Sequence, residues 1–163
     1  RSTGADHIIV LGDLLHAPAG VTDALIEEGA AWSREIPARV SIVPGNHDRH
    51  LSRVEAPWKL QIIDPATTIG PFAFHHYPVE TAGAFTWAGH EHPAKTLRIG
   101  GDSLKVPGFV IGQRLGVLPA FTRFAAGGGA CNQGAFHPIV DDSVLTPVHP
   151  PFPRLRAPAG GSV

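Results

Sequence analysis

The chain has 163 residues, of which 43% are hydrophobic and 17% charged, so it suits one globular domain and is too apolar for general disorder. Its net charge of −1 excludes a globally basic surface, so any contact with DNA or RNA has to come from a local patch. No stretch approaches the roughly 20 apolar residues of a membrane-spanning helix, and we expect no membrane association. The single cysteine, Cys131, cannot form an internal disulfide, which favours the cytoplasm.

Two short apolar runs, each followed by a polar loop, flank an amphipathic segment near the N-terminus. His7 to Leu11 and Arg39 to Val43 are rich in β-branched residues and predict buried strands. Between them, apolar residues recur at helical spacing from Val21 to Arg34, and Pro37 then ends the pattern. Strand, helix and strand in this order predict a parallel βαβ unit.

The remaining predicted elements are strands. They are Leu60 to Ile63, Phe72 to His76, Phe85 to Ala88, Leu104 to Val110 and Pro138 to Val148. The second half contains no convincing amphipathic helix, so we expect the sheet to become antiparallel there, in an α/β sandwich. We assign residues 1–149 to one domain and residues 150–163, rich in Pro, Gly and Ala, to a C-terminal tail.

Polar clusters directly follow several predicted strands, and they hold many of the ten histidines. The clusters are Gly12-Asp13-Leu14-Leu15-His16, Gly45-Asn46-His47-Asp48, His75-His76-Tyr77-Pro78 and Gly89-His90-Glu91-His92. Because loops beyond the carboxyl ends of strands converge in open α/β sheets, the four clusters predict one centre. Carboxylate, amide oxygen and imidazole suit Mn²⁺, Fe²⁺ or Zn²⁺, which favours metal-dependent hydrolysis.

Each cluster alone has a plainer explanation. An isolated Gly-Asp pair such as the one at Asp13 is more often a turn or N-cap, and Asn46 and Asp48 suit a tight loop. The combination of four clusters favours a metal site. His75 and His76 are alternatives, because adjacent residues on a strand face opposite sides.

The order GDxxH, GNHD, HxP and GHxH resembles the calcineurin-like metallophosphoesterase superfamily. This resemblance implies a two-sheet α/β sandwich of mixed β-sheets flanked by helices, with two divalent metal ions, Mn²⁺ first and Fe²⁺ or Zn²⁺ as alternatives. It implies that Asp13 bridges the two metals and that His92 binds the first metal. Asn46, His76 and His90 would complete the second metal's shell, and the HxP spacing selects His76 over His75.

The same resemblance implies catalytic roles for two residues of the GNHD motif. His47 would be the general acid that protonates the leaving oxygen, and Asp48 would orient it, while a hydroxide held between the metals attacks phosphorus. Arg49 directly follows the GNHD motif, and His16 is the last residue of the GDxxH motif. They are candidate substrate-binding residues, Arg49 through a phosphate oxygen.

This chain departs from the superfamily at its start. The family opens with a DxH motif on its first strand, which supplies an Asp and a His to the first metal, and no such motif is present. The expected fold therefore lacks an N-terminal strand-helix portion, and we interpret the chain as a fragment in which the first metal retains only Asp13 and His92.

A narrower resemblance covers nearly the whole chain. Val10 to Ala17, Gly45 to His50, Gly70 to Ala73 and Gly116 to Phe121 are similar to the bacterial ligase-associated DNA-damage-response endonucleases. That family implies a manganese-dependent nuclease or phosphodiesterase in DNA repair, working near a DNA ligase, a helicase and an exonuclease.

We therefore predict a two-metal phosphodiesterase or endonuclease acting on DNA or RNA. Two alternatives stay open: a phosphatase or phosphodiesterase for nucleotides or nucleotide sugars, and a non-catalytic binding module with the same fold. A groove of arginines and aromatic rings would favour a polymeric substrate. The candidate residues for such a groove are Arg49, Arg53, Trp58, Trp87 and Arg114.

Overall fold

The computed structural model describes residues 4–99, 101–122, 127–128, 134–141 and 143–147, so the predicted tail, residues 150–163, lies outside the described residues. Its small sheet has three parallel strands, β1 (His7–Val10), β2 (Arg39–Ile42) and β3 (Leu60–Ile62), in the order β1-β2-β3. Helix α1 (Asp23–Glu35) lies between β1 and β2 in the chain, which confirms the predicted βαβ unit. No helix in the described part of the chain has the length and apolar character that crossing a membrane requires.

Local sequence explains where α1 begins, ends and packs. Its N-cap is Thr22, whose hydroxyl accepts a hydrogen bond from the Leu25 amide at 3.2 Å. The helix ends before Pro37, which disfavours helical backbone at the residue preceding it. Trp58 packs against α1, and its Nε1 donates to the carbonyl of Ile26 at 2.9 Å. This packing fixes the helix on one face of the small sheet.

The larger sheet is mixed. Its strands are β4 (Thr67–Ile69), β5 (Phe72–His75), β6 (Phe85–Ala88), β8 (Asp102–Ile111), β9 (Leu115–Val117), β10 (Ala135–Val140) and β11 (Ser143–Val144), in the order β11-β10-β8-β9-β6-β5-β4. A further strand, β7 (Ala94–Ile99), pairs with β8 beside this path. β5, β6 and β9 are parallel neighbours, whereas β7, β8, β10 and β11 pair antiparallel, as predicted for the second half.

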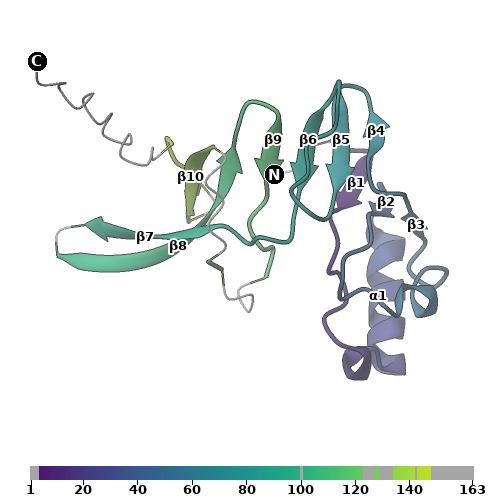
Figure 1. Cartoon of the computed structure of the whole chain (residues 1–163). Helices are drawn as coiled ribbons and strands as arrows, with labels where there is room; N and C mark the ends of the chain where they lie inside the picture. Colours follow the sequence, from purple (N-terminus) through teal and green to yellow (C-terminus); the bar gives the residue numbers. More distant parts are fainter. Residues whose placement is uncertain (1–3, 100, 123–126, 129–133, 142, 148–163) are drawn as a thin grey trace, which may run out of the picture.

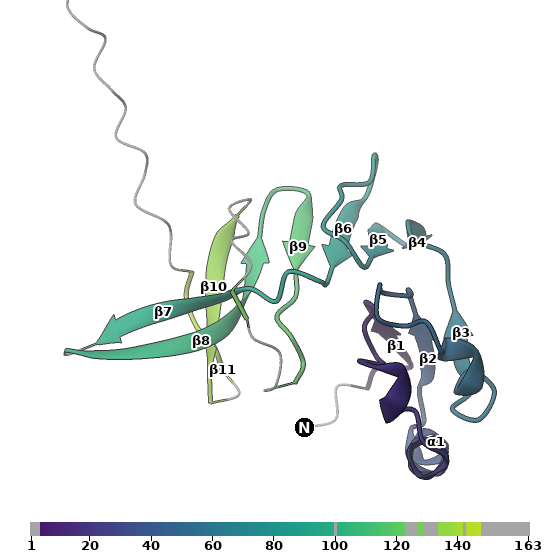
Figure 2. The ribbon, with the colours of Figure 1, turned by 60° about the horizontal axis from the view of Figure 1, so that its bottom comes forward.

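The helix and the two sheets lie in layers (Figure 1). Figure 2 shows the small sheet between α1 and the β4–β5–β6 part of the larger sheet. An apolar groove of about 220 Å³ lies between the two sheets. It is lined by Ile9, Leu11, Phe74, Trp87, Phe109 and Leu118. β7 and part of β8 form a hairpin that projects away from these layers (Figure 1, Figure 2).

Candidate metal centre

The loops that follow β1, β2, β5 and β6 bring four side chains together. Asp13, His76 and His90 each offer a ligand atom, and these atoms all lie within 4.8 Å of one another. The side-chain oxygen of Asn46 lies 3.0 Å from Nε2 of His76 and joins the same group. These four residues are the set that the sequence predicted for the second metal.

The Nε2 atom of His76 is the centre of this group. Its other ring nitrogen, Nδ1, lies 2.8 Å from the Leu11 carbonyl oxygen, which only accepts, so Nδ1 carries the proton. In the neutral ring Nε2 then presents a lone pair. It faces Asn46 Oδ1 and His90 Nδ1 at 3.0 Å each, and Asp13 Oδ2 at 3.6 Å.

Such an arrangement favours a cation. Carboxylate and amide oxygens only accept hydrogen bonds. Without a positive charge between them, the lone pairs of Asp13 Oδ2 and Asn46 Oδ1 would therefore face the lone pair of His76 Nε2, and the His76 side chain is only 3% exposed. A proton on Nε2 would satisfy one of these neighbours at a time. A divalent ion satisfies all four ligands together, and the mixed oxygen and nitrogen set suits Mn²⁺, Fe²⁺ or Zn²⁺.

His75 and His76 occupy different surroundings. Nε2 of His75 lies 3.0 Å from the Thr81 hydroxyl, and burial lowers the pKa of His75 below its usual 6.5. His76 follows the end of β5 and faces Asp13 and His90 instead. The structure therefore brings His76 rather than His75 into the candidate metal group.

Asp48 joins the loops after β1 and β2. Its buried carboxylate accepts hydrogen bonds from the backbone amides of Asp13 at 2.7 Å, Gly45 at 2.8 Å and Leu15 at 2.9 Å. In turn, Asp13 Oδ1 accepts from the His47 amide at 2.9 Å. Asp48 thus holds the backbone that carries both Asp13 and His47. The resemblance implied that Asp48 orients His47, but its contacts with the loop that carries Asp13 were not predicted.

Three glycines allow the loops to approach closely. A Cβ on Gly12, where φ is +84°, would lie 2.3 Å from His76 Nδ1. A Cβ on Gly45 would lie 2.3 Å from Asp13 Oδ1, and one on Gly89 would lie 2.7 Å from the Leu11 carbonyl oxygen. The glycines that precede Asp13, Asn46 and His90 are therefore required by packing.

Left-handed backbone occurs at three of the predicted ligands. The φ angles are 54° at Asp13, 66° at His90 and 47° at His92. For residues other than glycine this conformation costs roughly 1–2 kcal/mol each, and such strain concentrates at functional sites. His92 lies outside the group formed by Asp13, His76 and His90 in the described part of the chain.

One predicted catalytic residue and one predicted substrate-binding residue contact each other. The rings of His16 and His47 stack, with centroids 5.4 Å apart and planes 21° apart, and both side chains are exposed. Arg49 is exposed next to them in the sequence. The stacked imidazoles are open to a substrate.

Two contributors were missed by the sequence analysis. The ring of Tyr77 lies 4.5 Å from that of His90 and 4.8 Å from that of His76, so it packs against two of the ligands. Its position next to His76 in the HxP segment was an available signal. The Leu11 carbonyl, which orients His76, had no signal, because every residue carries such a group.

The suggested groove of arginines and aromatic rings is not formed. Trp58 is buried against α1, and Trp87 lines the apolar groove between the sheets. Arg53 donates to the Val21 carbonyl at 2.6 Å, and Arg114 donates to a backbone carbonyl in the loop before β6. These residues contribute to separate parts of the fold, so they do not decide between a polymeric and a small substrate.

Comparison with family models and with curated proteins finds no match. Among solved structures, the chain is similar to the crystal structure of Pseudomonas putida nuclease MPE, with a TM-score of 0.73 and 30% sequence identity. The similarity covers 88% of this chain and 71% of that chain. This chain belongs to the same family as that nuclease. Membership of the nuclease MPE family confirms the predicted fold class, a two-sheet α/β fold of the metallophosphoesterase type.

Proposed function

We propose that this chain is a calcineurin-like metallophosphoesterase that hydrolyses phosphodiester bonds in DNA or RNA. The observation that carries the proposal is the convergence of Asp13, Asn46 and His90 on the lone pair of His76. The resemblance of the four motifs to this superfamily and the similarity to a protein named as a nuclease support the same reading.

Two divalent cations, Mn²⁺ by preference, are the proposed cofactors. Asp13, Asn46, His76 and His90 would hold one cation, and Asp13 and His92 would contribute to the other. When bound, the cations supply Lewis acidity toward the phosphate and lower the pKa of the attacking water.

The chain's own residues complete the reaction. The bond between phosphorus and the leaving oxygen breaks as a bond to the water oxygen forms, the attacking water releases one proton to solvent, and His47 donates its proton to the leaving oxygen. A general acid of this kind contributes about 10² to 10⁴ in rate. Asp48 positions His47 through the shared loop, while Arg49 and His16 bind the phosphate oxygens from the exposed side.

The biological setting is proposed from the narrower resemblance alone. It is DNA repair in the cytoplasm, in functional association with a DNA ligase, a helicase and an exonuclease.

The test measures cleavage of bis-p-nitrophenyl phosphate and of a single-stranded DNA oligonucleotide with Mn²⁺ and with EDTA. We expect Mn²⁺-dependent cleavage of both, abolished in Asp13→Ala and reduced about 10² to 10⁴-fold in His47→Ala. Asp64→Ala, which removes an exposed carboxylate far from the clusters in sequence, is the control and retains activity.

Other outcomes would favour the alternatives. Cleavage of bis-p-nitrophenyl phosphate without cleavage of the oligonucleotide would indicate a small-molecule phosphodiesterase. Mn²⁺ binding without any cleavage would indicate a non-catalytic binding module.

A further inference from the structure

The β7–β8 hairpin begins a few residues after two predicted metal ligands, His90 and His92. β7 begins at Ala94, two residues after His92, and every residue of β7 pairs with a residue of β8 between Asp102 and Pro107. At about 3.3 Å per residue, Arg98 lies roughly 20 Å from His92 along the extended chain. We call residues 94–107 the arm.

The two faces of the arm differ in character. Cross-strand partners share a face, and the pairs Thr96 with Lys105 and Arg98 with Ser103 lie on one side. All four side chains are exposed and polar. The other face carries Leu97, Leu104 and Val106, which give it an apolar character, and Asp102 at its tip.

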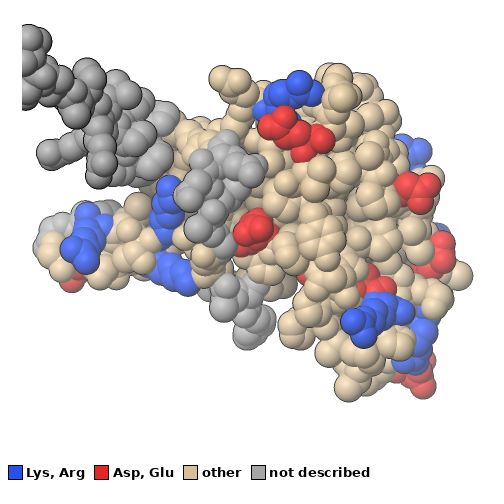
Figure 3. Space-filling model, in the orientation of Figure 1, with Lys and Arg blue, Asp and Glu red and all other residues tan. Residues whose placement is uncertain are grey.

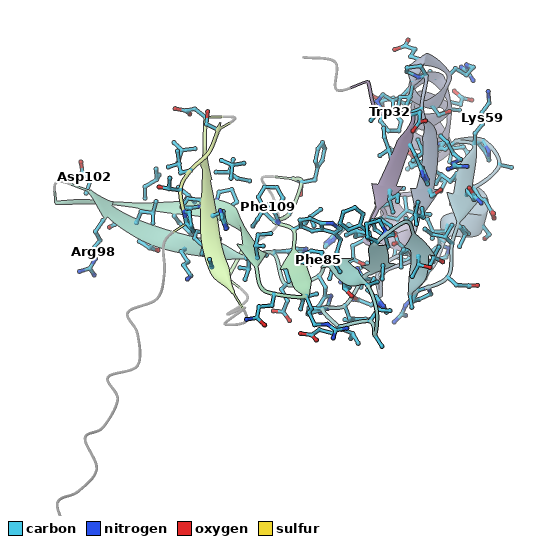
Figure 4. All side chains as sticks on the ribbon, turned by 90° about the horizontal axis from the view of Figure 1, so that it is seen from above. Trp32, Lys59, Phe85, Arg98, Asp102 and Phe109 are labelled. Carbon is cyan, nitrogen blue, oxygen red and sulfur yellow. The ribbon has the colours of Figure 1, made fainter. Side chains whose placement is uncertain are left out.

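The polar face carries two cations, Arg98 and Lys105. Within the described residues, neither Arg98 nor Lys105 forms an ion pair or a side-chain hydrogen bond. Lys95 differs, because its ammonium lies 5.0 Å from the centre of the Phe136 ring. Figure 3 shows Lys and Arg surface on the arm, and Figure 4 shows Arg98 and Asp102 pointing to opposite sides of its tip.

Charge is divided unevenly along the sequence. Residues 1–93 contain 6 Lys or Arg and 11 Asp or Glu, whereas residues 94–163 contain 7 and 3. The part that carries all the predicted ligands is therefore acidic and repels a polyanion before metals bind. An asymmetry of this kind suggests contact with nucleic acid through a basic segment, and the arm carries three of the seven cations, Lys95, Arg98 and Lys105.

We propose that the polar face of the arm binds the phosphate backbone of a nucleic-acid substrate whose scissile bond lies at the metal centre. This inference rests on the proposed function and narrows its substrate to a polymer. Arg98 and Lys105 contact phosphates, while Thr96 and Ser103 donate hydrogen bonds beside them. The contacts carry no base specificity.

The length of the arm determines how long a substrate must be to contact both the metal centre and Arg98. A span of roughly 20 Å corresponds to about six phosphates at the duplex spacing of 3.4 Å per strand, and to about three phosphates in a single strand stretched to about twice that spacing. A trinucleotide reaches the metal centre without reaching Arg98, whereas a 24-mer reaches both. The arm therefore acts on long substrates alone.

The experiment uses a double variant, Arg98→Gln/Lys105→Gln, which we call the arm variant. The matched control is a second double variant, Arg34→Gln/Lys59→Gln. The control removes the same charge from exposed positions outside the arm. Binding of a fluorescent 24-mer is measured by anisotropy in EDTA over a range of salt concentrations. Hydrolysis of the 24-mer, a trinucleotide and bis-p-nitrophenyl phosphate is measured with Mn²⁺.

In the arm variant, we expect binding of the 24-mer at 0.1 M salt to weaken roughly tenfold and the salt slope to fall by about 1.4, since single strands give about 0.7 per phosphate contact. We expect the KM of the arm variant for the 24-mer to rise by about the same factor as its binding weakens. Hydrolysis of the trinucleotide and of bis-p-nitrophenyl phosphate stays unchanged, and the control behaves as the wild type throughout.

The outcomes separate this inference from the proposed function. If the arm variant binds the 24-mer as tightly and with the same salt slope as the wild type, the arm does not bind nucleic acid. A change in oligomeric state of the arm variant by size-exclusion chromatography would assign the arm to a second copy of the chain instead. If the wild type hydrolysed none of the three substrates, the proposed function would be overturned, but the binding measurement would still test the arm.

Discussion

Removal of the Asp48 carboxylate is expected to destabilise the whole protein. Asp48→Ala removes the buried carboxylate that accepts three hydrogen bonds, donated by the backbone amides of Asp13, Leu15 and Gly45. At the low end of about 1.5 kcal/mol for each bond to a charged group, the free energy of unfolding falls by about 4–5 kcal/mol. For a domain of this size that corresponds to a fall in melting temperature of roughly 10–18 °C.

Asp48→Asn should have a smaller effect. One oxygen accepts from both Asp13 and Gly45, so an amide oxygen in its place keeps two bonds. The amide nitrogen would then face the Leu15 amide, donor against donor. We expect a loss of about 2 kcal/mol, or roughly 4–8 °C.

Thermal unfolding followed by circular dichroism, without added metal, measures both losses. Asp64→Ala is the control, because it removes an exposed carboxylate and should shift the unfolding free energy by less than about 0.5 kcal/mol. Unfolding of Asp48→Ala at the wild-type temperature would refute the reasoning. A normal melting temperature with reduced activity would instead favour a role confined to orienting His47.

Three further predictions concern the ligand loops. Gly12→Ala should lower the free energy of unfolding by more than about 3 kcal/mol, and Gly70→Ala by about 1 kcal/mol. Both glycines have positive φ, but only Gly12 lacks space for a Cβ. Equal losses of the two variants in urea unfolding would contradict this. His76→Ala should weaken Mn²⁺ binding at least about 100-fold by calorimetry, while His75→Ala changes it little; the reverse order would assign the site to His75. Tyr77→Ala should weaken Mn²⁺ binding and Tyr77→Phe should not, because the ring rather than the hydroxyl contacts the ligands; equal effects would exclude ring packing.

The sequence predicted those strands whose composition is distinctive. β1, β2 and β6 are apolar, short and followed by polar loops, and the structure has all three. β4, β7 and β9 were not predicted for different reasons. β7 alternates poorly and carries two cations, while β4 and β9 have three residues each, too few to show a period. Their pairing depends on neighbours that are distant in sequence.

The candidate site was predictable in its residue types but not in its supports. The order of motifs named Asp13, Asn46, His76 and His90 together, and these side chains do converge. The partner that orients His76, a backbone carbonyl 65 residues away, leaves no trace in composition or spacing. The contacts of Asp48 are likewise with backbone amides, so no pattern of side chains reveals them.

The left-handed backbone at Asp13, His90 and His92 sets folding against function. A glycine at any of these positions would relieve local strain of about 1 kcal/mol or more while removing a ligand, so variants selected for heat resistance alone would drift toward inactivity. Metal binding opposes this drift, because an ion held only by the folded state stabilises it in proportion to the logarithm of its concentration. We therefore expect the amount of intact protein in a cell, and not its activity alone, to follow the supply of divalent metal.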